Sequence, residues 1–168
     1  MAQRYQVHLI RHGVAEALGD LWPDDAKRPL SEAGMASLRR SARRLVAAGV
    51  HFDVVLTSPL LRARQSAEIM AAVCDPKPSI VVIDSLAPGG SHQELLADLA
   101  KQAKRTRLAL VGHEPGLGEL AARLIGLRQP LRFKKAGVLR IDLDDFPPTG
   151  LGALRWMMPP KLLRRLRK

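Results

Sequence analysis

The chain has 168 residues, 46% of them hydrophobic, which suits a single domain over residues 1–168 with a sizeable core. Its formal net charge of +11 favours an anionic substrate or an acidic partner. No apolar run approaches the roughly 20 residues that span a bilayer, and no signal-peptide cleavage pattern is present, so we expect a cytoplasmic protein without a membrane segment. Cys74 is the only cysteine, which excludes an internal disulfide and a multi-cysteine zinc site.

Short β-branched segments alternate with longer segments of helical periodicity. The alternation predicts strands over residues 5–11, 53–57, 80–83 and 107–112, and helices over residues 31–48, 59–73, 91–104 and 116–126. Two later strands, residues 137–143 and 152–157, are joined by the turn-rich "DDFPPTG" and form a hairpin. We therefore predict an α/β fold, a three-layer αβα sandwich whose central sheet is mostly parallel but mixed at one side.

Two of the predicted helices carry start signals. Ser31 is predicted to cap the first helix, and Ser58 is predicted to cap the second, with Pro59 at its first helical position. Arg62 and Arg64 then fall in the first two turns, where cations oppose the positive end of the helix dipole. An anion bound at this helix start would remove that conflict.

The basic C-terminus raises the question of nucleic-acid binding. The stretch "KLLRRLRK", residues 161–168, holds five basic residues, but no zinc finger, RNA-recognition motif, helix-turn-helix or row of stacking aromatics accompanies it. We expect no nucleic-acid partner. The stretch is interpreted as a short amphipathic helix, residues 160–168, with Leu162, Leu163 and Leu166 on its apolar face.

Three charged motifs follow strands whose carboxyl ends share one edge of the predicted sheet, where open α/β sheets bind ligands. They are "RHG" at residues 11–13, "TSPLLRAR" at residues 57–64 and "GHEPG" at residues 112–116. Each has an ordinary structural alternative: a polar strand exit, a solvated helix face or a loop histidine. Two arginines and two histidines converging without a carboxylate partner favour a functional site instead.

These residue types fit phosphoryl chemistry. Two guanidinium groups, from Arg11 and Arg62, match phosphate oxygens and neutralise charge in the transition state. A histidine attacks phosphorus only through an unprotonated ring nitrogen, and nearby guanidinium groups should lower its pKa below the usual value of about 6.5. We therefore expect His12 to be neutral and able to form a covalent phosphohistidine.

The motifs "LIRHG", "RPLSEAG", "FDVVLTSPLLRARQSAE" and "LALVGHEPG" together resemble the histidine phosphatase superfamily, which has the phosphoglycerate mutase-like fold. The short length and the ending "W..PPK.L" are most similar to its SixA-type phosphohistidine phosphatases. The resemblance implies that no metal or cofactor is needed. It also implies a phosphorylated nucleophile at His12, phosphate-clamping arginines at Arg11 and Arg62, a second pocket histidine at His113, a close-approach turn at Gly13, and further substrate contacts at Arg28 and Ser58.

One departure from the superfamily concerns the general acid. Mutases and many esterases have a carboxylate after the third strand, where this chain has Ala87, Pro88 and Gly89. Four other carboxylates are candidates to replace it: Asp84, Glu16, Asp24 and Asp25. A missing acid suits phosphohistidine, because imidazole has a pKa near 6.5 and leaves as a neutral ring after one protonation, with any needed assistance from His113.

The sequence thus favours a phosphatase that hydrolyses phosphohistidine on a protein, through a phosphorylated His12. A short chain leaves little room for a lid, and an open, basic site admits an acidic phosphoprotein, phosphate or another small anion. Two alternatives stay open. One is a phosphatase for small phosphate monoesters, and the other is a non-catalytic module that binds phosphate or a phosphoprotein.

Overall fold

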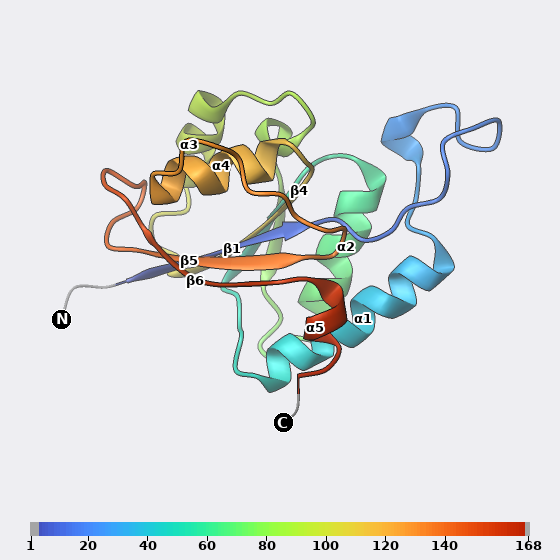
Figure 1. The fold of residues 1–168 in the computed structure, drawn as a ribbon, viewed down its shortest axis with the longest axis horizontal. Helices are drawn as coiled ribbons and strands as arrows, with labels where there is room; N and C mark the ends of the chain where they lie inside the picture. Colours follow the sequence, from blue (N-terminus) through green and yellow to red (C-terminus); the bar gives the residue numbers. More distant parts are fainter. Residues whose placement is uncertain (1–3, 167–168) are drawn as a thin grey trace.

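A six-stranded mixed sheet forms the centre of the protein, in a computed structural model that describes residues 4–166 (Figure 1). Its strand order is β3-β2-β4-β1-β5-β6. The parallel strands are β1 (Tyr5–Arg11), β2 (Val54–Thr57), β3 (Ser79–Val82) and β4 (Arg107–Gly112). The antiparallel hairpin is β5 (Val138–Leu143) and β6 (Ala153–Met158). The predicted α/β fold with a mixed sheet is therefore confirmed.

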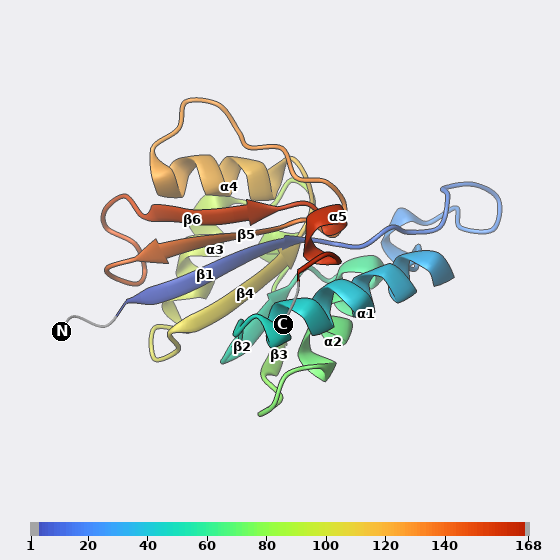
Figure 2. The same cartoon turned by 60° about the horizontal axis from the view of Figure 1, so that its bottom comes forward.

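Helices cover both faces of this sheet. They are α1 (Glu32–Ala47), α2 (Leu61–Ala72), α3 (His92–Ala100), α4 (Gly116–Ile125) and α5 (Pro160–Leu163), with 3-10 turns η1 (Asp25–Lys27) and η2 (Asp84–Leu86). Helices α1, α2 and α5 lie on one face, and α3 and α4 lie on the other (Figures 1 and 2). The three predicted layers are present.

The core is aliphatic on both faces because alternate strand residues point to opposite sides. In β1, Val7 and Leu9 pack with residues of α3 and α4, whereas Ile10 packs with residues of α1 and α2. Strands β1, β2 and β4 are buried along most of their length, as expected for parallel strands covered by helices. Among residues 4–166, no helix combines the length and hydropathy that a membrane crossing needs.

Two helices are shorter than predicted. Helix α3 ends at Ala100, and successive turns carry the chain on to Arg105. Helix α5 has four residues, and the predicted helix end at 167–168 lies outside the described residues. Leu163 is fully buried, but Leu162 is 52% exposed, so the prediction that both leucines share the apolar face is wrong.

The start of α2 also differs from the prediction. The helix begins at Leu61 after an N-cap at Leu60 that has no side-chain hydrogen bond, so Ser58 is not its N-cap. Ser58 Oγ instead accepts a 3.3 Å hydrogen bond from the Leu60 backbone and lies 2.8 Å from a ring nitrogen of His113. The serine is thereby drawn into the cluster at the carboxyl edge of the sheet.

Candidate active site

His12 follows the last residue of β1, and its hydrogen bonds fix which ring nitrogen carries the proton. Its backbone N–H donates to Gly112 on the neighbouring strand at 3.1 Å, and the next residue, Gly13, donates to Ser66 Oγ at 3.0 Å. His12 Nδ1 lies 2.7 Å from the Gly13 carbonyl oxygen, which only accepts hydrogen bonds. Nδ1 therefore carries the proton, and Nε2 presents its lone pair to the site.

Arg62 projects from the first turn of α2 toward that lone pair. Its side chain is 5% exposed, and its Nε lies 3.4 Å from His12 Nε2. The other two guanidinium nitrogens contact Asp25: Nη1 donates to the backbone carbonyl at 2.7 Å, and Nη2 pairs with Oδ2 at 2.9 Å. Arg62 thus reaches both the histidine and a carboxylate.

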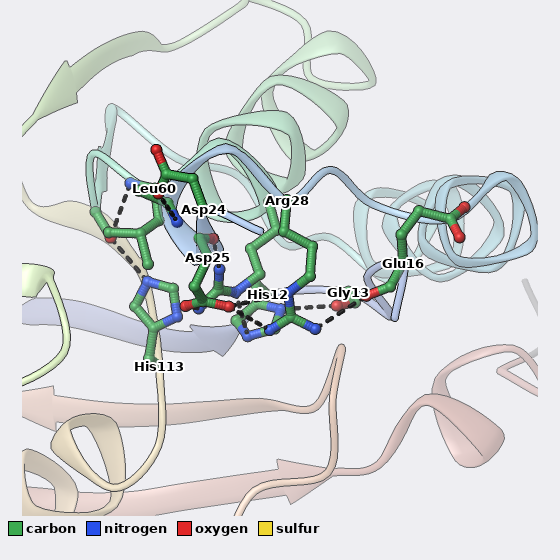
Figure 3. A network of polar contacts seen from close by, with 11 residues as sticks. His12, Gly13, Glu16, Asp24, Asp25, Arg28, Leu60 and His113 are labelled. Atoms are coloured by element: carbon green, nitrogen blue, oxygen red, sulfur yellow. Dashed lines mark hydrogen bonds and ion pairs between the residues drawn. The ribbon is translucent and has the colours of Figure 1, made fainter. Parts of the chain in front are cut away.

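His113 follows the last residue of β4 and faces His12 across the site, with ring centroids 5.0 Å apart. Its Nε2 lies 2.8 Å from Ser58 Oγ, whereas its Nδ1 is buried without a hydrogen-bond partner among the described residues. Figure 3 shows His12, His113 and Asp25 gathered in one site. Nδ1 of His113 is therefore available to a ligand.

Arg11 completes the cluster from the end of β1. Its Nη1 donates to the Phe133 carbonyl oxygen at 2.7 Å, which anchors the side chain, while its Nε is buried without a partner in residues 4–166. Buried polar groups are nearly always paired in native proteins. The unpaired atoms of Arg11 and His113 lie in one cluster, so a polar ligand bound there would give both a partner.

Burial keeps both histidines neutral. Desolvation lowers the pKa of His12 to about 4, with smaller contributions from Arg62, Arg11 and Lys135, against a raising contribution from the Gly13 carbonyl. The pKa of His113 falls to about 3, also chiefly through desolvation. The predicted lowering of the His12 pKa is present, but burial contributes more to it than the guanidinium groups.

The predicted absence of a carboxylate partner is wrong, because Asp25 from η1 enters the site. Its Oδ1 lies 2.8 Å from Arg28 Nη2, and its Oδ2 pairs with Arg62. Burial raises the pKa of Asp25, but hydrogen bonds from Arg62 and Arg28 outweigh it and leave the pKa lowered. Asp25 is therefore an ionised carboxylate that links two arginines.

Arg28 lies behind Asp25 rather than on the histidines. Besides pairing with that carboxylate, its Nη1 donates to the Glu16 backbone carbonyl at 2.9 Å (Figure 3). These contacts hold together the segment 14–30, which projects from the body of the protein (Figure 1). Arg28 therefore positions Asp25, and Asp25 in turn engages Arg62.

The other candidate acids lie elsewhere. Asp24 caps η1 and pairs with Lys27, Glu16 contributes its backbone carbonyl, and Asp84 is exposed at the start of η2. The segment 87–90 lines a cavity of about 200 Å³ that adjoins His113. Within residues 4–166, no group of three or more His, Cys, Asp or Glu side chains is arranged as a metal site.

Comparison with known proteins identifies this arrangement. The model of the histidine phosphatase superfamily (branch 1) matches residues 7–87. The chain is 31% identical to the phosphohistidine phosphatase SixA of Escherichia coli, over 92% of this chain and 94% of that protein. It is also 43% identical to an uncharacterized protein of Picosynechococcus sp., over 80% of this chain and 82% of that protein.

The solved structures agree with the sequence relatives. The structure of the protein histidine phosphatase SixA complexed with tungstate superposes with a TM-score of 0.82 and 29% identity, covering 94% of this chain and 99% of the other. Sequence and fold thus match over nearly the whole length of both chains. The chain is therefore a phosphatase of the histidine phosphatase superfamily and belongs to its SixA-type branch.

Proposed function

We propose that this protein removes the phosphoryl group from phosphohistidine on a protein, with His12 as the nucleophile that carries it in between. The observation that carries the proposal is the state of His12. Its ring is buried and neutral, its Nδ1 is hydrogen-bonded to the Gly13 carbonyl oxygen, and its Nε2 lone pair faces the Arg62 guanidinium group. A site used only to bind phosphate has no need of a free nucleophile. The relation to SixA supports phosphohistidine as the substrate.

In the first step, His12 Nε2 attacks phosphorus and the bond between phosphorus and the substrate nitrogen breaks. The bonding electrons return to the substrate ring, which is protonated on its other nitrogen and departs as neutral imidazole. Arg11 and Arg62 are proposed to hold the phosphoryl oxygens, whose charge shifts during the transfer. Water then attacks the phosphorylated His12, releasing inorganic phosphate and restoring the ring.

His113 suits hydrogen-bond donation better than proton transfer. We infer that Ser58 Oγ, which accepts from the Leu60 N–H, donates its own proton to His113 Nε2, which puts the ring N–H on Nδ1. A pKa of about 3 keeps the ring neutral at physiological pH. We propose that Nδ1–H of His113 binds a phosphoryl oxygen.

The absence of an acid from the segment 87–90 favours a leaving group that needs none. Asp25 does not replace it, because the lowered pKa of its carboxyl keeps that group ionised beside Arg62 and Arg28. A sugar or serine alkoxide leaves poorly without a proton donor, whereas imidazole leaves as a stable neutral molecule. The site's composition thus supports a phosphoramidate over a phosphate ester.

The proposal is tested by phosphate release from three substrates at matched concentration: a protein phosphorylated on histidine, a sugar phosphate and an aryl phosphate. We expect the highest kcat/KM for the phosphohistidine protein. Faster turnover of the sugar phosphate would overturn the substrate assignment. A His12→Ala protein that binds phosphate but hydrolyses none of the three is the expected control.

A further inference from the structure

The connection between α4 and β5 displays a group of exposed cations, and its later residues lie beside the active site. Residues 126–137 run back along α4 to the catalytic edge of the sheet (Figure 2). Arg128, Arg132, Lys134 and Lys135 of this connection are all exposed. None of these four forms an ion pair with another described residue, whereas the arginines at 28, 62, 107 and 140 do. We call these four residues the basic loop.

The backbone of the basic loop is fixed in place. Leu131 N–H donates to the Gly118 carbonyl in α4 at 3.2 Å, and Phe133 N–H donates to Glu114 Oε1 at 2.9 Å. Phe133 is 3% exposed and inserts into the core, so the residues on either side of it, Arg132 and Lys134, point outward. The cations therefore project from an anchored segment.

The basic loop is continuous with the active site. The Phe133 carbonyl oxygen holds Arg11, and the charge of Lys135 contributes to lowering the pKa of His12. A groove of about 670 Å³ is lined by Arg11, Glu114, Pro115 and residues 129–134. A polypeptide whose modified side chain enters the site would run along this groove and meet Arg132 and Lys134.

We propose that the basic loop is a docking surface for acidic residues that flank the phosphorylated histidine of a protein substrate. The inference rests on the proposed function and adds the chemistry of the partner. Unpaired cations at the rim of a site raise the encounter rate with an acidic partner and fix its orientation. Because Arg132 and Lys134 are solvent-exposed, this contribution should weaken as salt screens it.

The test uses two synthetic peptides of equal length that carry one phosphohistidine, flanked by four glutamates in one and four glutamines in the other. At low ionic strength, we expect kcat/KM of the unaltered protein to be about tenfold higher for the acidic peptide, within the range of electrostatic steering. The double substitution R132E/K134E should abolish this preference and leave the glutamine peptide within about twofold of its original rate. At about 1 M salt, where the screening length is about 3 Å, the preference should vanish.

The matched control is K104E/R105E, which makes the same change in charge on exposed residues just before β4, at the opposite end of the parallel strands. It should keep the acidic preference. If both variants lose the preference for the acidic peptide, that preference comes from the net charge of the protein, and the proposal that the basic loop is a docking surface is overturned. Equal rates on the two peptides would also overturn it, but would leave the proposed function standing.

Two further outcomes are decisive. If neither peptide is hydrolysed, the proposed function and the docking surface both fail. If R132E/K134E instead loses binding of a fluorescent single-stranded oligonucleotide while its kcat/KM values for both peptides stay unchanged, the basic loop is a nucleic-acid surface and the inference is overturned.

Discussion

At the scale of single residues, the site is organised by which atoms are already occupied. His12 Nδ1 is bonded to a carbonyl and Nε2 is left facing Arg62, while Arg11 Nε and His113 Nδ1 are buried without partners in the described chain. The Asp25 carboxylate lies among these groups and pairs with Arg62. The Asp25 carboxylate thus forms an ion pair with Arg62, the same cation that we propose binds the phosphoryl group.

Asp25→Asn should strengthen the binding of oxyanions. The substitution keeps the size of the side chain and removes a negative charge that repels phosphate at Arg62, so we expect the inhibition constants of phosphate and tungstate to fall about tenfold. Steady-state inhibition measures both constants. The control is Asp24→Asn, the neighbouring carboxylate that pairs with Lys27 rather than Arg62, and it should stay within about twofold. Unchanged or weaker inhibition of Asp25→Asn by phosphate and tungstate would show that the Asp25 carboxylate does not compete with oxyanions for Arg62.

At the scale of elements, α4 supports the site through the connection that follows it. Gly118 in α4 approaches the backbone of this connection so closely that an added Cβ would overlap the Leu131 carbonyl oxygen. The same connection supplies the Phe133 carbonyl that anchors Arg11. The helix therefore sets the position of Arg11, an arginine that we propose binds the phosphoryl group, through a backbone contact.

Gly118→Ala should lower stability although alanine is the better helix former. Alanine gains about 1 kcal/mol of helix propensity, but displacing the connection costs more, and we expect a net loss of about 2 kcal/mol and reduced kcat. Gly116→Ala, two residues earlier in the same helix, meets nothing within 4 Å and should be neutral or slightly stabilising. Urea unfolding measures both; equal stabilities of the two variants would refute the close contact.

Most helices and strands were predictable, because the spacing of hydrophobic residues along the sequence follows the period of a strand or of a helix. The end of α3 at Ala100, where local turns replace the helix, and the late start of α2 were not predicted. Ser58 before Pro59 has the form of a helix cap, but the prediction was wrong because the hydroxyl contacts His113, 55 residues away. Tertiary contact overrode the local signal.

The arginines and histidines at the strand ends were predictable for a related reason: parallel strands bring their carboxyl ends to one edge. The engagement of Asp25 was not, because it depends on the path of segment 14–30, which no periodicity describes. A partial signal existed in "DDAKRP", where Asp25 precedes Arg28 by one helical turn. This spacing predicts the ion pair between Asp25 and Arg28, but it does not predict the contact between Asp25 and Arg62.

At the scale of the whole molecule, the fold holds three histidines in buried, neutral form. Desolvation is the largest cause of the lowered pKa values of His8, His12 and His113, which fall to about 4, about 4 and about 3. An unfolded histidine titrates near 6.5, so the unfolded chain binds more protons below that pH. The contribution of these histidines to the free energy of unfolding is therefore fully present above pH 6.5 and is lost as the pH falls toward 4.

His8→Phe isolates one part of this acid sensitivity outside the proposed catalytic residues. His8 packs against Phe52 and Trp156, and phenylalanine preserves those aromatic contacts. Removing its titration should reduce the loss of unfolding free energy between pH 7 and pH 5 by about 2 kcal/mol. Urea unfolding across this range measures the change. An identical pH dependence in both proteins would show that His8 is not held neutral by the fold.

The central claim is that His12 carries the phosphoryl group, and the most direct test is to trap it. The protein is mixed with a peptide bearing radiolabelled phosphohistidine, quenched in alkali within milliseconds and digested. We predict a label that is stable to alkali, labile to acid and located on His12, and no label in His12→Ala. Sustained hydrolysis by His12→Ala, or rapid turnover by the unaltered protein without any labelled His12, would contradict the account.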